Sequence, residues 1–86
     1  MGSQVMEQAP KKTELDKKFD AVFEAARKSL NVLRYQEFKG PTEGPRTEGT
    51  FQFLINWLNE YSSDSEKKKI RSNLPEKYNN VAEMIK

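Results

Sequence analysis

The side chains with the most versatile chemistry are missing from this sequence, which contains no histidine and no cysteine. The commonest general acid or base, the commonest metal ligand, the strongest nucleophile and the disulfide are therefore excluded together. Acid–base work would fall to carboxylates, and two pairs lie close in sequence: Asp16 with Asp20, and Glu43 with Glu48. A catalytic carboxylate needs an apolar pocket that shifts its pKa, whereas these pairs are expected on a solvated helix face and in a loop. We therefore predict no catalytic residues, and a protein that is not an enzyme.

The same absence limits metal and cofactor binding. Only an oxygen-ligand site for calcium or magnesium remains conceivable, and the sequence lacks the Asp-rich spacing of a calcium loop. The glycine- and proline-containing segment between residues 36 and 49 lacks the Gly-x-x-x-x-Gly-Lys-Ser/Thr spacing that cradles phosphates. We predict no metal and no cofactor.

A basic cluster, Lys67, Lys68, Lys69 and Arg71, is the candidate for contact with nucleic acid. From residue 64 to residue 86 the chain has six basic and four acidic side chains, which is a small excess for neutralising several phosphates. The simpler interpretation is a solvated helix face on which lysine aids solubility. Nucleic-acid binding through this cluster is kept as the alternative function.

Three aromatic residues, Phe53, Trp57 and Tyr61, follow one another at steps of four and so share one helix face. A lone tryptophan in a small helical domain is often the centre of its core, which is the first interpretation. The second is that the stripe exceeds what so short a chain can enclose, and that it anchors a partner protein. We predict a non-catalytic interaction or regulatory domain that binds another protein through this stripe and the adjoining loop over residues 36–49.

The helix that must support the core is predicted over residues 14–35. Thr13 and Asp16 resemble a capping box at its start. Its apolar residues recur at helical spacing and define a single inner face, formed by Leu15, Phe19, Val22, Phe23, Ala26, Leu30 and Leu33.

Two Gly-Pro steps between residues 36 and 49 disfavour regular helix, so a long loop is predicted there, either functional or disordered. A helix over 50–62 follows, with Thr50 as its cap and Phe51, Leu54, Ile55 and Leu58 as its core-facing stripe.

Ser63 and Glu66 form a capping box for a short helix over 64–72. Pro75 suits the first turn of a last helix over 75–85. The predicted fold is therefore all-α, a small bundle of three principal helices plus one short helix, forming a single domain over residues 13–86.

Residues 1–12 show no periodicity and are interpreted as a disordered leader or an expression-tag remnant. The sequence has neither a stretch long and apolar enough to span a bilayer nor a secretory signal, so we expect no membrane partner and a cytoplasmic location. A monomer or a weak homo-oligomer is expected, and a fragment of a larger protein is a further interpretation.

Overall fold

The computed structural model describes residues 13–86, which form helices joined by turns, without a strand in this range. The helices are α1 (Glu14–Ser29), α2 (Val32–Thr42), α3 (Glu48–Tyr61), α4 (Asp64–Asn73) and α5 (Asn79–Ala82), with a 3-10 turn, η2 (Glu76–Tyr78), before α5. The all-α prediction is confirmed, whereas the predicted leader lies outside the described residues. No helix of residues 13–86 has both the length and the hydropathy needed to cross a bilayer.

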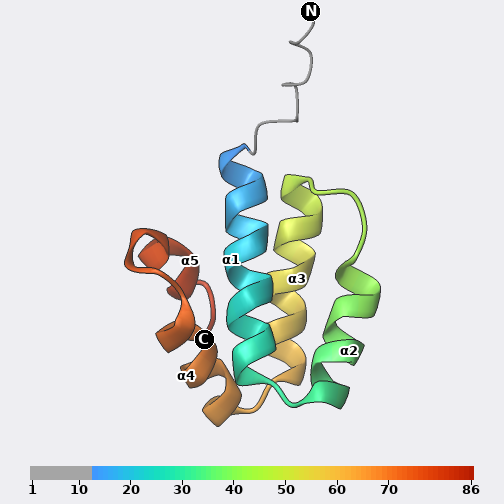
Figure 1. Cartoon of the computed structure of the whole chain (residues 1–86), viewed down its shortest axis with the longest axis vertical. Helices are drawn as coiled ribbons and strands as arrows, with labels where there is room; N and C mark the ends of the chain where they lie inside the picture. The colour runs from blue at the N-terminus through green and yellow to red at the C-terminus, as the bar shows by residue number, and fades with distance from the viewer. Residues whose placement is uncertain (1–12) are drawn as a thin grey trace, which may run out of the picture.

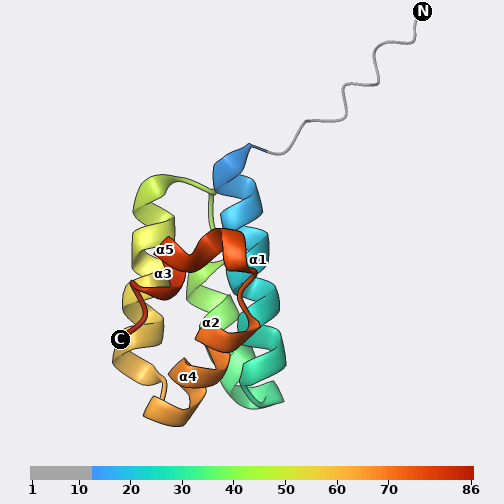
Figure 2. The same cartoon turned by 90° about the vertical axis from the view of Figure 1, so that its left-hand side faces the viewer.

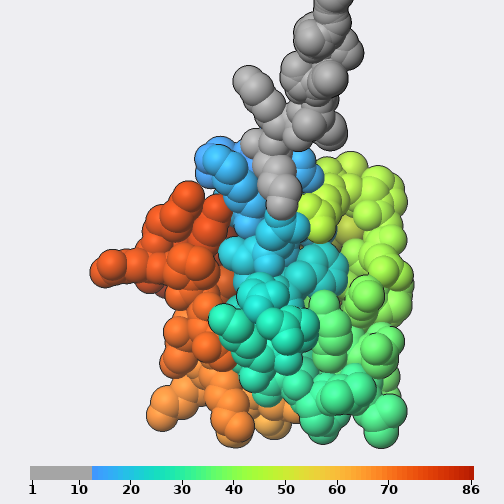
Figure 3. Space-filling view, in the orientation of Figure 1, coloured from blue at the N-terminus to red at the C-terminus, as the bar shows by residue number. Residues whose placement is uncertain are grey.

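Helices α1 and α3 run side by side through the middle of the molecule (Figure 1). Helix α2 lies on one side of them and runs back antiparallel to both, while α4 and α5 lie on the other side (Figure 1). The segment containing η2 and α5 crosses in front of the other helices, from the side of α1 to the side of α3, as Figure 2 shows. In the space-filling view, α1 occupies the centre of one face, flanked by α2 and by the C-terminal segments (Figure 3).

Both predicted capping boxes are present. The Asp16 N–H donates to Thr13 Oγ1 at 3.1 Å, and the Thr13 N–H donates back to the Asp16 carboxylate at 3.3 Å. At α4, the Glu66 N–H donates to Ser63 Oγ at 3.1 Å, and the Ser63 N–H donates to Glu66 Oε1 at 2.8 Å. Each box satisfies N–H groups that a helix start leaves without an intrahelical partner, which fixes where α1 and α4 begin.

The prediction of one helix over 14–35 is wrong, because α1 ends at Ser29 and Leu30 has extended backbone. Asn31 then caps α2, with the Arg34 N–H donating to its side chain at 2.8 Å. A continued helix would carry Phe38 beyond the end of the 14-residue α3, which is about 21 Å long. The turn instead folds α2 back and buries Phe38 completely. Leu33, predicted to face the core, is 77% exposed as a result.

The long loop predicted over 36–49 is also wrong, because α2 continues to Thr42 and includes Pro41 in its last turn. Proline has no N–H, so Pro41 removes the intrahelical bond to the Glu37 carbonyl, and because only Thr42 follows it in the helix this break falls at the helix end. The buried Thr42 hydroxyl donates to the Phe38 carbonyl at 2.7 Å, so it is buried with a hydrogen-bond partner. The connection to α3 is therefore only residues 43–47.

The core lies between α1, α3 and the segments on either side of them. Helix α3 begins at Glu48 and not at residue 50, because its cap is Thr47, whose Oγ1 accepts from the Thr50 N–H at 3.1 Å. The predicted core-facing stripe of this helix is buried. The buried apolar side chains are Phe19, Val22, Ala25, Ala26, Leu30, Phe38, Phe51, Leu54, Ile55, Leu58, Ile70, Leu74, Tyr78, Val81 and Ile85.

The continuous helix predicted over 75–85 is replaced by η2 and the four-residue α5, so the described chain has five helices where three principal helices and a short one were predicted. Polar side chains hold this segment to α3 and α4. Asn59 Nδ2 donates to the Met84 carbonyl at 2.9 Å, and Asn59 Oδ1 accepts from the Lys86 N–H at 2.7 Å. Arg71 donates to the Ile85 carbonyl at 2.9 Å. These bonds keep Ile85 buried although regular helix ends before it.

Candidate functional site

A groove of about 400 Å³ lies between α2 and α3. Its lining combines all three residues of the predicted aromatic stripe with Pro41 from the last turn of α2 and two polar residues of α3; the full set is Pro41, Phe53, Asn56, Trp57, Glu60 and Tyr61. The antiparallel course of the two helices places the end of α2 beside the exposed face of α3. We refer to these six residues as the aromatic groove.

The floor of the aromatic groove is Trp57, which is held from both sides. Its ring lies 5.3 Å from that of the fully buried Phe38 and 5.0 Å from that of Tyr61, with tilted geometry in each case. Phe38 in turn contacts Phe23 of α1, with 5.3 Å between the ring centroids. Because each ring is packed against the next, the tryptophan is pre-organised and loses little side-chain entropy on binding.

The two outer aromatic side chains remain in solvent. Phe53 is 46% exposed and Tyr61 is 55% exposed, whereas Trp57 is half-buried against the core. The Gln52 side chain donates to Asn56 Oδ1 at 3.1 Å along the same rim of α3. An anchored tryptophan flanked by exposed aromatic rings is the composition typical of the centre of a protein interface.

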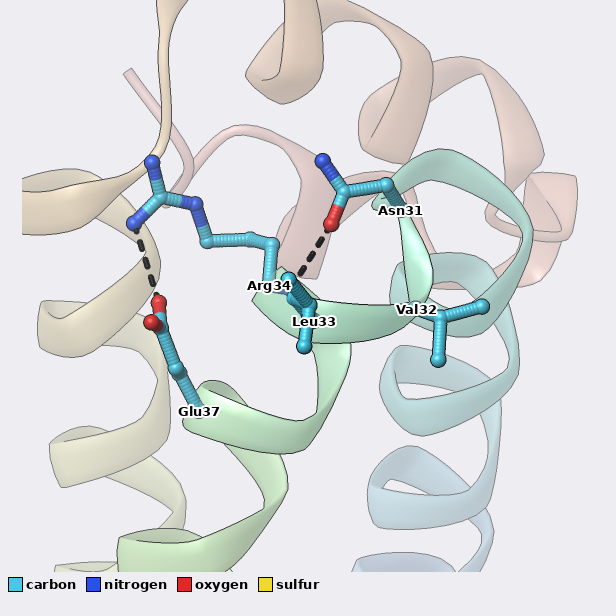
Figure 4. Close-up of a pocket in the computed structure, with 5 residues that line it drawn as sticks. All are labelled: Asn31, Val32, Leu33, Arg34 and Glu37. Atoms are coloured by element: carbon cyan, nitrogen blue, oxygen red, sulfur yellow. Dashed lines mark hydrogen bonds and ion pairs between the residues drawn. The ribbon is translucent and has the colours of Figure 1, made fainter.

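A second, larger hollow of about 530 Å³ lies at the first turn of α2. Figure 4 shows that its polar side chains engage one another: Arg34 reaches Glu37, with 3.3 Å between Nη1 and Oε1, and its backbone N–H reaches Asn31. Val32 and Leu33 are exposed here by 76% and 77%, and Val32 points away from the ion pair (Figure 4). All five lining residues belong to one seven-residue stretch, so this is an open helix end and not a groove between elements.

The predicted basic cluster is divided by the fold. Lys67 donates to the Lys86 carbonyl at 2.9 Å and its side chain is only 12% exposed, while Arg71 donates to the Ile85 carbonyl. Lys68 and Lys69 are exposed. Two of the four cations therefore serve the C-terminal segment, and the structure does not bring the four together on one face open to phosphates.

The carboxylate pairs have structural partners. Arg46 of the α2–α3 connection lies 2.9 Å from Asp20 and 3.7 Å from Asp16, and its guanidinium lies over the Phe19 ring. Glu43, from the second pair, lies 3.7 Å from the Lys39 ammonium, whereas Glu48 is exposed at the start of α3. Within residues 13–86 there is no group of three acidic side chains able to hold a metal ion.

No family model matches the chain, and no curated protein or solved structure matches it. The groove itself therefore carries the functional argument. Sequence reasoning singled out three of its six residues but missed Pro41, Asn56 and Glu60. Asn56 and Glu60 share the α3 face of the stripe at helical spacing, so periodicity held a signal for them. No sequence signal placed Pro41 in the groove, because the course of α2 was not predicted.

Proposed function

We propose that this protein is a non-catalytic interaction domain that binds another protein through the aromatic groove. One observation carries the proposal: Phe53 and Tyr61 stay exposed on either side of a tryptophan that is fixed against Phe38. Exposed aromatic rings around a fixed anchor supply large contact area at low entropic cost. A regulatory role in the cytoplasm is the setting we propose for such a domain.

The alternative, nucleic-acid binding through residues 67–71, has weaker support. Lys67 and Arg71 are occupied by backbone carbonyls, and only Lys68 and Lys69 of the cluster are exposed. Duplex and single strands bind mainly through several phosphate contacts at once, which two free lysines supply poorly.

A display selection with random peptides tests the proposal. We expect peptides enriched on the full chain to lose binding to a Phe53→Ser, Tyr61→Ser double variant, because the flanks of the groove are then polar. A Val32→Ser, Leu33→Ser variant is the matched control, since it removes an equally exposed apolar pair at the other hollow. The fluorescence of Trp57, the one tryptophan of the chain, reports occupancy directly.

The proposal is wrong if no peptide is enriched, or if the enriched peptides bind the two double variants equally well. It is also wrong if bound peptides leave the emission of Trp57 unchanged and shift amide resonances only outside α2 and α3.

A further inference from the structure

A carboxylate without a partner stands at one end of the aromatic groove. Glu60 is exposed, lines the groove next to Tyr61 and forms no ion pair or side-chain hydrogen bond with any residue from 13 to 86. By contrast, the two acidic side chains of α2 and its cap are paired, Glu37 with Arg34 and Glu43 with Lys39. The groove therefore presents one uncompensated negative charge beside an exposed aromatic ring.

The basic side chains near the groove are all engaged elsewhere. Between residues 32 and 61 the chain has three basic and four acidic side chains, so this segment is negative although the whole chain carries +2. Arg34 pairs with Glu37 within α2 and also lies 4.0 Å from Glu66 of α4, and Lys39 pairs with Glu43 at the cap of α2. Arg46 is turned to α1, where it lies 2.9 Å from Asp20. None of the three neutralises Glu60.

The end of α3 adds to this negative potential. Its last turn holds no basic residue, and the C-terminal end of a helix carries a partial negative charge from its carbonyls. Lys67 lies at this end of α3, with its ammonium 3.4 Å from the Asn59 carbonyl. That ammonium also donates to the Lys86 carbonyl at 2.9 Å, so it is committed to the C-terminal segment.

From this charge pattern we infer that the partner is a basic linear segment of another protein, in which an arginine lies next to apolar residues. The inference rests on the proposed function and names the chemistry of the occupant. Apolar side chains lie against Phe53 and Pro41, and the guanidinium lies over Tyr61 and pairs with Glu60. Arginine suits this end because its planar group stacks on an aromatic face and forms two hydrogen bonds with a carboxylate.

The dimensions fit a short segment. Phe53 and Tyr61 are eight residues apart on α3, which corresponds to about 12 Å along the helix. An extended peptide covers that distance with about four residues. A few apolar side chains with one arginine beside them therefore span the groove from the Pro41 end to Glu60.

Charge-matched peptides test the inference. Peptides selected for binding to the groove are synthesised with arginine, with citrulline, which has a similar shape but no charge, and with glutamate in its place. Replacing arginine by citrulline should weaken binding to the full chain about 3- to 10-fold, as a cation–π contact and an exposed ion pair predict. In a Glu60→Gln variant the same replacement should cost about two- to threefold less, because the ion pair is then absent while the cation–π contact with Tyr61 remains. Glu48→Gln is the matched control, since Glu48 is also exposed and lies at the opposite end of α3.

The outcomes separate the two proposals. If groove-binding peptides are found but the citrulline forms bind as well as the arginine forms, the cationic partner is refuted while the interaction domain stands. If no peptide binds the groove, both fail. Quenching of Trp57 that depends on protein concentration alone, or competition by an oligonucleotide at the groove, would replace the basic segment by a second copy or by nucleic acid and would also refute it.

Discussion

Replacing Asn59 by alanine should loosen the C-terminal segment and lower the free energy of unfolding. The side chain makes two bonds to that segment, to the Met84 carbonyl at 2.9 Å and from the Lys86 N–H at 2.7 Å. A hydrogen bond contributes about 0.5–1.5 kcal/mol net, and more when its loss leaves a buried group unpaired. The Met84 bond is partly buried, whereas water can replace the exposed Lys86 bond, so the expected loss is about 1–2 kcal/mol.

Urea unfolding followed by far-UV circular dichroism measures this loss. Each kcal/mol corresponds to a fall in Tm of roughly 4–8 °C for a domain of this size. Asn56→Ala is the control, because Asn56 lies on the same helix, is exposed and bonds only the Gln52 side chain. Both variants gain the helix propensity of alanine, so their difference isolates the bonds to the C-terminal segment.

A difference of less than about 0.5 kcal/mol between Asn59→Ala and Asn56→Ala would refute this reasoning. Hydrogen exchange gives a second readout. Amides of α5 and of residues 83–86 should lose protection in Asn59→Ala and keep it in Asn56→Ala, because only Asn59 reaches across to that segment.

Three further predictions concern single side chains. Ser62→Ala should leave stability unchanged or raise it by up to about 1 kcal/mol in urea unfolding, because the buried Ser62 hydroxyl has no partner among the described residues. A clear loss would show that the hydroxyl is bonded. Arg46→Ala should cost about 1 kcal/mol by the same measurement, from exposed ion pairs with Asp20 and Asp16 and one cation–π contact; an unchanged midpoint would contradict this. The hydrogen bond from Arg27 lowers the pKa of Glu24. The stabilisation that the ionised Glu24 side chain provides is therefore complete above the ordinary glutamate pKa of about 4.3, and it disappears as the pH falls through the lower pKa of the folded protein. The stability gap between the protein and a Glu24→Gln variant should therefore close in acid, and a gap independent of pH would refute the assignment.

Local signals in the sequence predicted the starts of α1 and α4. The boxes at Thr13 and at Ser63 depend on side chains three residues apart, so the sequence contains all the information they need. The start of α3 was placed at Thr50, although the cap is Thr47. Both are threonines three residues apart, and the pattern alone does not distinguish them.

Tertiary packing decided what the sequence did not show. The apolar period of α1 continues through Leu33, so a longer helix was the natural prediction, yet burying Phe38 against Phe23 and Trp57 favours a turn at Leu30. The low helix propensity of proline was overridden in the same way at the end of α2, which includes Pro41. Periodicity within α3 sufficed to separate a buried stripe from an aromatic one, because it depends only on helix geometry. The second wall of the groove could not be predicted, since it comes from the helix that was missed.

Helix α2 forms a lateral arm that is joined to α1 through Leu30 and Asn31 and to α3 through residues 43–47, and the contact of Phe38 with Trp57 helps to hold this arm against α3. A ligand that touches Pro41 and Trp57 together bridges the arm and the body of the protein. Its binding energy then opposes detachment of the arm by thermodynamic linkage. Affinity for the ligand and attachment of the arm thus become a single coupled equilibrium, and substitutions under the tryptophan tune recognition without touching the ligand.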